Sequence, residues 1–395
     1  MPDIDFCTYF DQLPTTPVLD QASATVLEDP GTIKVVHGFA RARLDTGKFI
    51  KLEQAADLPG YANLATVFLN GWRLAYSGGD HHVEGLGTFI RVSPGRGQVI
   101  WNAIGALADD SHDRPYELSY YYTFIAWNDN RLHVRAFDRG DADEVCQTQQ
   151  PGLDDKFFWS RNRDTTTALS VFPTFLFFPI SGGAAVLPRG FGFRWGSDHH
   201  LLQFGYNLDF SETVAQKPSY KKALGELTPQ LDPAEVRFGL GWLSWNSYVI
   251  VKDDSDRRDY FFGELVSGMS GEDVHVIQPP FFILPLTGAS GALGGAGVKT
   301  KEVVVDAIPY QYAIPMLTGW DIGYTAGDQH VKEIGVWIDS FNYEWVPGST
   351  AGRLRYQVSS VLRDRDTWPD NYFRHKVTVL CLRHTPTRVT EPGEP

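Results

Sequence analysis

An acidic residue and a histidine two positions later occur three times in the chain, each time after a Gly and two aromatic residues. The three segments are "GWRLAYSGGDHHVEGLGTFI", "GFGFRWGSDHHLLQFGYNL" and "GWDIGYTAGDQHVKEIGVWI". Their acid and histidine pairs are Asp80 and His82, Asp198 and His200, and Asp328 and His330. A carboxylate and an imidazole together can bind a metal ion or transfer protons.

The same residues also suit a β-hairpin, in which Gly supplies a positive φ, Asp accepts backbone hydrogen bonds and His begins the next strand. Repetition favours this structural interpretation, because a turn that determines the fold must recur in every copy, whereas a catalytic site is usually kept in one. The third copy also has Gln329 where the others have His81 and His199. We therefore predict structural turns, no metal site and no cofactor, and a melting temperature that a chelator leaves unchanged.

A second motif follows each copy of the first: Asp, then Ser or Thr, then four residues, then Tyr. Its members are Asp110, Ser111 and Tyr116, then Asp254, Ser255 and Tyr260, then Asp366, Thr367 and Tyr372. One interpretation is an Asx or Ser/Thr turn whose tyrosine closes the edge of the core. The other is a binding loop, because a sugar needs acceptors for its hydroxyls and a ring for its C–H face. The sequence leaves both interpretations open.

Strand-like segments flank both motifs, and hydrophobic residues alternate with a period of two in most of the chain. The first motif recurs about every 120 residues, which is a usual size for a β-sandwich domain. We predict an all-β fold of three tandem antiparallel β-sandwich domains, formed by internal triplication, with an extended N-terminal arm. Whether the repeats pack around a pseudo-threefold axis or line up as a rod is left open.

The predicted boundaries follow from the positions of the motifs and of the segments rich in Pro, Gly and small polar residues. They are 1–35 for the arm, 36–140 for the first repeat, 141–272 for a linker and the second repeat with an insertion at about 211–238, 273–385 for the third repeat, and 386–395 for a flexible tail.

The composition disfavours several classes of function. A formal net charge of -13 gives little attraction for nucleic acid or anionic lipid. The N-terminus "MPDIDFCTYF" lacks the basic start and apolar run of a signal peptide, so we expect synthesis in the cytoplasm, with later release or incorporation into a particle left open. The longest apolar stretch is short and broken by Pro and Gly, so no membrane insertion is predicted. Motifs of hydrolases, nucleotide-binding enzymes and zinc proteases do not occur, and we predict that the chain is not an enzyme.

The third repeat resembles the H-type lectin domain in "KEVVVDAIPYQYAIPMLTGWDIGYTAGDQHVKEIGVWIDSFNYEW" and "RLRYQVSSVLRDRDTWPDNYFRHKVTVLCL". The matching positions are Leu317, Asp321 and Ile322, then Asp366, Thr367, Trp368 and Tyr372. The resemblance implies a six-stranded antiparallel β-sandwich that forms trimers and holds N-acetylgalactosamine-type sugars between subunits. It implies Trp368, Asp370 and Tyr372 as sugar contacts. The loop residues of the other repeats are further candidates: Asp110, Tyr116, Asp254 and Tyr260.

We therefore expect a non-enzymatic recognition protein that binds cell-surface carbohydrate through loops at one end of each sandwich, where three weak sites in one chain raise avidity. The alternative is a structural subunit of a large assembly, such as a phage tail, a capsid decoration or a contractile injection machine, in which divergent repeats contact different neighbours. An unrecognised enzyme comes third. The predicted partners are a cell-surface glycan or neighbouring protein subunits, in a homo-oligomer or a larger assembly.

Overall fold

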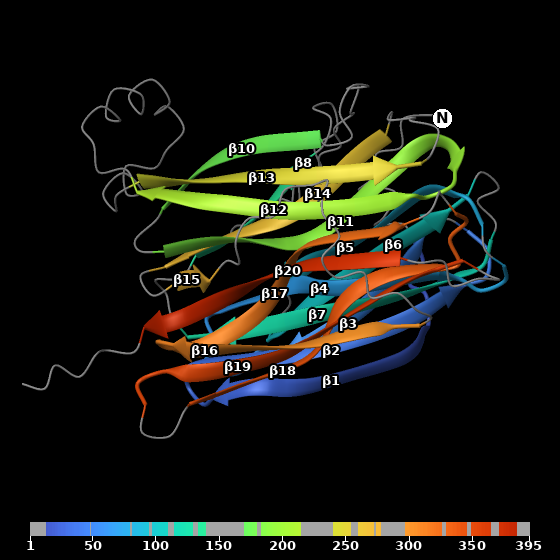
Figure 1. Ribbon diagram of the computed structural model, residues 1–395. Helices are drawn as coiled ribbons and strands as arrows, with labels where there is room; N and C mark the ends of the chain where they lie inside the picture. The colour runs from blue at the N-terminus through green and yellow to red at the C-terminus, as the bar shows by residue number, and fades with distance from the viewer. Residues whose placement is uncertain are drawn as a thin grey trace, which may run out of the picture.

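The described part of the chain consists of β-strands and their connections (Figure 1). The computed structural model describes residues 13–47, 49–79, 81–94, 97–109, 114–128, 133–139, 170–179, 183–214, 240–253, 260–271, 274–277, 297–325, 329–345, 349–364 and 371–384. These residues form nineteen strands and no helix, which confirms the predicted all-β class. Accordingly, no described segment is a helix of the length and apolarity needed to cross a membrane.

The strands fall into three groups of seven, six and six, which follow the three predicted repeats except at β1 and β8. The first group is β1 (Val18–Asp29), β2 (Ile33–Leu44), β3 (Ile50–Asp57), β4 (Leu64–Tyr76), β5 (Val83–Pro94), β6 (Gln98–Ala108) and β7 (Tyr116–Trp127). The second group is β8 (His133–Arg139), β10 (Ser170–Pro179), β11 (Gly183–His199), β12 (Gln203–Val214), β13 (Leu240–Lys252) and β14 (Tyr260–Gly271). The third group is β15 (Val274–Ile277), β16 (Lys299–Ile308), β17 (Tyr310–Tyr324), β18 (Glu333–Trp345), β19 (Gly352–Arg363) and β20 (Asn371–His384).

The strand before each first-motif turn pairs with the last strand of its own repeat, and the strand after the turn pairs with the next strand along the chain. The first kind of pair is β4 with β7, β11 with β14, and β17 with β20. The second kind is β5 with β6, β12 with β13, and β18 with β19. All of these pairs are antiparallel, and the same pattern occurs in each repeat.

Three further strand pairs join the repeats to one another, and we call them joints. They are the β4–β18 joint, the β17–β12 joint and the β11–β5 joint. Each repeat is thereby bonded to both of the others, so the repeats form a ring and not a rod. The resulting sheets have the orders β1-β2-β7-β4-β18-β19-β16, β10-β13-β12-β17-β20-β15 and β3-β6-β5-β11-β14-β8.

Each copy of the first motif also has a Gly five residues after its His, and these motif glycines, Gly87, Gly205 and Gly335, lie at the joints. In the strand register, the opposed residues are Gly335 and Arg73, Gly205 and Asp321, and Gly87 and Gly192. A Cβ atom at Gly335 would lie 2.5 Å from the carbonyl oxygen of Trp72, and one at Gly87 would lie 2.7 Å from the Cα of Gly192. Because backbone atoms approach this closely, these positions of the sheet require Gly.

The first aromatic residue of each motif copy lies in the centre of the ring. Trp72, Phe191 and Trp320 are each at most 1% exposed. The ring centroids are 5.0 Å apart for Trp72 and Phe191, 4.7 Å for Phe191 and Trp320, and 5.8 Å for Trp72 and Trp320. Aromatic pairs at such distances add about 0.5–1.5 kcal/mol beyond the burial of their surface. The three repeats therefore share one hydrophobic core, which explains why β4 and β17 are buried along most of their length.

The N-terminal segment supplies a seventh strand to one sheet. The described part of the predicted arm contains β1, which pairs with β2, and β2 itself begins at Ile33. From Val18 on, this segment is therefore not a separate extended arm but the edge strand β1 and the beginning of β2. Most of β1 is exposed, including Leu19 at 55%.

Strand β8 also departs from the predicted boundaries. It falls within residues 36–140, yet it pairs with β14 of the second repeat. This position is equivalent to that of β2 next to β7 in the first repeat and of β15 next to β20 in the third. Most of the predicted linker and insertion, and the tail 386–395, lie outside the described residues.

Candidate functional site

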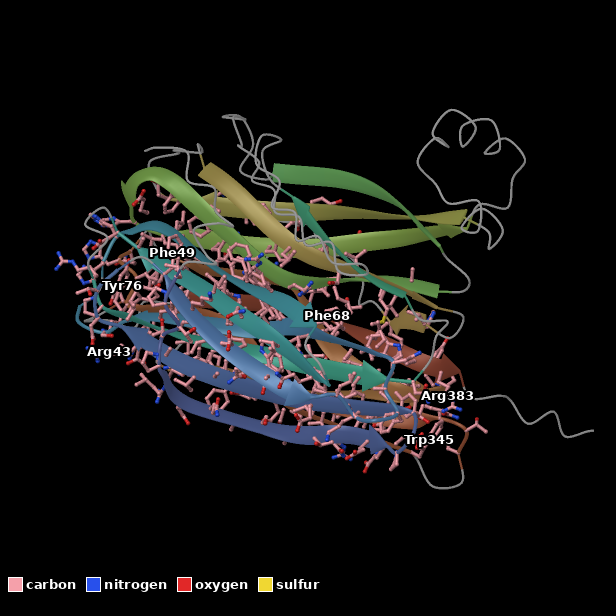
Figure 2. The ribbon with its side chains drawn as sticks, turned by 180° about the vertical axis from the view of Figure 1, so that it is seen from behind. Arg43, Phe49, Phe68, Tyr76, Trp345 and Arg383 are labelled. Carbon is pink, nitrogen blue, oxygen red and sulfur yellow. The ribbon has the colours of Figure 1, made fainter. Side chains whose placement is uncertain are left out.

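Both recurring motifs come to the same end of the molecule. The registers place Tyr76 opposite Tyr116, Trp195 opposite Tyr260, and Gly323 opposite Tyr372. Each second-motif tyrosine therefore lies beside the strand that leads into a first-motif turn. We call the region of the three first-motif turns, residues 76–83, 195–202 and 324–331, the motif end. Figure 2 shows Tyr76 at this end and Trp345 at the opposite end of the molecule.

The three turns contact one another through backbone pairing. The pairs are His81 with Val331, Leu201 with Gln329, and His199 with Val83. In the first pair the two backbone N–H groups donate to the opposite carbonyl oxygens, at 3.1 Å from His81 and 2.9 Å from Val331. Each turn is therefore held by the other two, and the motif end is a continuation of the three joints.

One histidine from each turn lies in the middle of the motif end. The ring centroids of His82 and His200 are 4.6 Å apart, those of His82 and His330 are 4.6 Å apart, and those of His200 and His330 are 4.7 Å apart. One nitrogen from each ring lies within 4.8 Å of the other two, and all three residues are half-buried. We call these residues the histidine triad. The sequence showed three separate turns, and nothing in it indicated that the turns meet.

Tyrosine hydroxyls of the first motif hold the backbone of the histidine triad. The hydroxyl of Tyr76 donates to the carbonyl oxygen of His82 at 3.2 Å. The hydroxyl of Tyr324 donates to the carbonyl oxygen of His330 at 3.3 Å. The second aromatic residue of the motif therefore has the same role in the first and third repeats, which is to fix the turn that carries the histidine.

The neighbouring histidine of the first copy has different surroundings. The ring of His81 packs edge-on against Tyr76, with centroids 4.8 Å apart. Its Nδ1 lies 3.7 Å from a carboxylate oxygen of Asp109, and Nε of Arg114 lies 3.3 Å from the same oxygen. The ring of His81 thus lies beside Tyr76 and Asp109, while the ring of His82 contacts those of His200 and His330 in the other two turns.

The described candidate tyrosines are divided between the core and the surface. Tyr116 is fully buried, its hydroxyl donates to the carbonyl oxygen of Gly105 at 2.9 Å, and burial raises its pKa. This environment matches the core interpretation of the second motif and leaves no access for a sugar. Tyr372 is half-buried, its hydroxyl donates to Asp321 at 3.3 Å, and burial raises its pKa.

The remaining candidates are not part of the described structure or have undescribed side chains. Outside the described residues lie Asp80, Asp110, Asp254, Asp328, Trp368 and Asp370. Asp198 and Tyr260 lie in β11 and β14, with side chains that are not described.

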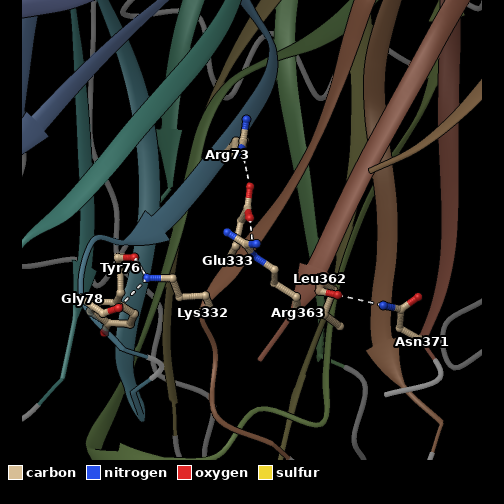
Figure 3. Close-up of polar contacts among 8 residues, drawn as sticks. All are labelled: Arg73, Tyr76, Gly78, Lys332, Glu333, Leu362, Arg363 and Asn371. Carbon is tan, nitrogen blue, oxygen red and sulfur yellow. Dashed lines mark hydrogen bonds and ion pairs between the residues drawn. The ribbon is translucent and has the colours of Figure 1, made fainter. Parts of the chain in front are cut away.

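An ion-pair group lies across the β4–β18 joint next to the motif end (Figure 3). The carboxylate of Glu333 accepts from Nε of Arg73 and lies 2.6 Å from Nε of Arg363. The side chain of Glu333 is 3% exposed, whereas those of the two arginines are about one-third exposed. Next to it, the ammonium group of Lys332 donates to two backbone carbonyl oxygens of the first turn, those of Tyr76 and Gly78.

The β17–β12 joint has a different polar contact at the corresponding place. The side-chain amide of Gln203 donates to Asp321 at 2.8 Å. Burial raises the pKa of Asp321, although its hydrogen bond with Gln203 and the charge of Arg374 act in the opposite direction. A carboxylate without a close ionic partner is less stable in such a position than one held between two guanidinium groups.

Comparisons with known proteins add no relative. No protein-family model, no curated protein and no solved structure matches this chain.

Proposed function

We propose that the chain is a non-enzymatic recognition protein in which three β-sandwich repeats form a ring, so that one chain imitates a trimer, and that its motif end binds cell-surface carbohydrate. The observation that carries this proposal is the convergence of both recurring motifs on one end of the molecule. Loops held at one end of a rigid sheet framework are a common arrangement for binding surfaces.

The sheet topology supports the sandwich interpretation of each repeat. Every repeat supplies two blocks of three strands, which lie in two different sheets. The blocks are β2-β7-β4 with β5-β6-β3, β8-β14-β11 with β12-β13-β10, and β15-β20-β17 with β18-β19-β16. Six antiparallel strands per repeat and a threefold arrangement are what the resemblance to H-type lectin domains implies.

The second-motif loops support a sugar as the ligand. Three such loops begin and end beside the three turns, so the chain would present three sites in the same direction and gain avidity towards a surface that carries many copies of one sugar. The third loop contains Trp368 and Asp370, an aromatic ring and a carboxylate suited to the C–H face and the hydroxyls of a sugar.

A glycan array with the full chain tests the proposal, with Trp368→Ala as the variant and Trp345→Ala as its control. Trp345 is an exposed tryptophan at the opposite end of the molecule. We expect Trp368→Ala to reduce glycan binding at least tenfold without changing thermal unfolding, and Trp345→Ala to bind like the wild-type chain. Absence of glycan binding by the wild-type chain, or equal binding by both variants, would contradict the sugar site.

A second candidate function is that of a subunit in a larger assembly, and the edges of the seven-stranded sheet favour it. Both edge strands expose large hydrophobic side chains, with Val18 and Leu19 at 39% and 55% on β1 and Val304 at 47% on β16. An exposed hydrophobic edge strand tends to pair with another chain. Light scattering coupled to size exclusion, with electron microscopy of the same fractions, distinguishes this function from glycan recognition. Rings or filaments that Leu19→Lys and Val304→Lys abolish would make assembly the main function.

A further inference from the structure

The histidine triad has the composition of a site for a transition-metal ion. His82, His200 and His330 are half-buried, and one nitrogen of each lies within 4.8 Å of the others. Neutral imidazole is a suitable ligand for Zn²⁺ and the other late divalent ions of the first transition row, whereas Ca²⁺ and Mg²⁺ prefer oxygen ligands. Three imidazoles with no other ligating group among the described residues of this cluster therefore favour an ion of the zinc class.

The distances fit such an ion after a small adjustment. Nitrogen ligands bind Zn²⁺ at about 2.0–2.1 Å, so three of them in tetrahedral geometry are roughly 3.3 Å apart. The nitrogens of the triad are within 4.8 Å of one another, so they must approach one another by at most about 1.5 Å to bind one ion. Three protein ligands leave the fourth position of a tetrahedral ion for water.

Backbone pairing and tyrosine hydroxyls hold the three turns that carry the triad. Each turn is paired with the other two, through His81 with Val331, Leu201 with Gln329, and His199 with Val83. The hydroxyls of Tyr76 and Tyr324 hold the carbonyl oxygens of His82 and His330. Contacts that fix the position of a ligating residue raise the affinity for a metal ion.

Because the three turns meet, the recurrence of histidine in all three favours a shared metal site over a purely structural role. A histidine kept in three separated turns indicates a structural role, but three turns that meet supply three ligands to one ion. The position just before the triad residue differs among the copies, with His81, His199 and Gln329, whereas the triad residue is histidine in all three. The position whose rings meet in the middle of the motif end is therefore histidine in every copy, while the position before it is not.

We propose that the histidine triad binds one zinc-class divalent metal ion, which links the three repeats at the motif end. This proposal replaces the turn-only interpretation of the first motif and the expectation that a chelator has no effect. It does not depend on the proposed sugar binding, because it concerns only the turns and not the second-motif loops.

The test uses the full chain, freed of metal by a chelator that is then removed. We expect one equivalent of Co²⁺ to produce the visible absorption of a tetrahedral site, Zn²⁺ to displace it, and Zn²⁺ to raise the melting temperature. His82→Gln, His200→Gln and His330→Gln should each reduce Zn²⁺ affinity at least tenfold. His81→Gln, one residue away in the same turn, should bind Zn²⁺ like the wild-type chain.

Two results would overturn the proposal. One is a wild-type chain that shows neither the Co²⁺ absorption nor a change in melting temperature with Zn²⁺, because the three rings would then pack together without an ion. The other is a His82→Gln chain that folds and keeps the wild-type affinity, because the ion would then bind elsewhere. Circular dichroism of each variant in chelator verifies folding, and the wild-type titration decides the question even if one variant does not fold.

Discussion

The β4–β18 and β11–β5 joints share a backbone arrangement and differ in their side chains. In both, the strand before a turn pairs with the strand after a turn of another repeat, and a motif glycine lies at the crossing. The β4–β18 joint adds Arg73 and Glu333 as an ion pair. At the corresponding positions the β11–β5 joint has Gly192 and Gly85, which have no side chains to pair.

This difference indicates which features the ring requires. Backbone hydrogen bonding and the clearance provided by Gly occur at every joint for which the contacts of the motif glycine are described. The polar side chains differ from joint to joint, so they change the stability of a joint whose strand pairing the backbone already determines. Substitutions at the glycines should therefore have larger effects than substitutions at the charged residues.

The largest expected effect is that of a single methyl group at either joint. Gly335→Ala and Gly87→Ala each place a Cβ atom within 2.7 Å of backbone atoms of the paired strand. Because the backbone and not a flexible side chain must move, we expect a loss of more than about 3 kcal/mol or failure to fold. Gly78→Ala is the control, since a Cβ there has no atom within 4 Å. Urea unfolding at neutral pH measures all three, and a mild effect at Gly87 alone would mean that the joint without ion pairs is the more adaptable one.

Acid should weaken the contact between β2 and β18 beside the β4–β18 joint. His37 donates through Nε2 to the carbonyl oxygen of Ile338 at 2.9 Å, and burial lowers its pKa from 6.5 to about 4. The pKa of His37 is lower in the folded state than in the unfolded state. Its contribution to the free energy of unfolding is therefore complete above pH 6.5 and is lost as the pH falls through 4, by about 3 kcal/mol in total. Unfolding by urea between pH 7 and pH 4 measures this loss.

The control for this acid effect is His37→Asn, which should flatten the pH dependence in part. The pH dependence that remains in this variant should have the same sign, because His375 is still present and burial also lowers its pKa to about 4. An unchanged slope in His37→Asn would contradict the assignment.

The smallest effects are expected at the polar contacts themselves, and they should differ in sign. Glu333→Gln leaves Arg73 and Arg363 without their carboxylate, and we expect a loss of about 1–2 kcal/mol, since both guanidinium groups are partly exposed and screened by water. Asp321→Asn removes a desolvated carboxylate of raised pKa and should be neutral or stabilising at pH 7. Equal losses at the two positions in urea unfolding would show that the polar contacts are equivalent after all.

The sequence predicted the all-β class, which the structure confirms, because the pattern that indicates it lies within short stretches of the chain. Alternating hydrophobic residues indicate strands, and the recurring spacing of Gly, aromatic, Asp and His indicates equivalent turns. The buried position of Tyr116 also matches one of the two interpretations of its motif.

The joints and the histidine triad could not be predicted from one sequence, because spacing within a motif says nothing about where its copies lie relative to one another. Gly87 and Gly335 illustrate this. A motif glycine near a turn suggests a positive φ, but neither of these two has one, and each provides room for a strand of another repeat. The position of these glycines within strand-like sequence is the signal from which close strand pairing could have been predicted.

The strand pairing across repeats also determines the order in which the chain can complete its fold during synthesis. β4 has β18 as its neighbour, and His37 bonds to Ile338, so the first sheet needs residues made near the end of translation. Such distant contacts slow folding, and an unpaired strand edge is a site of aggregation. The first repeat must therefore leave the ribosome with the edge of β4 open, and a chain cut short before β18 should bind chaperones or aggregate instead of forming a smaller stable protein.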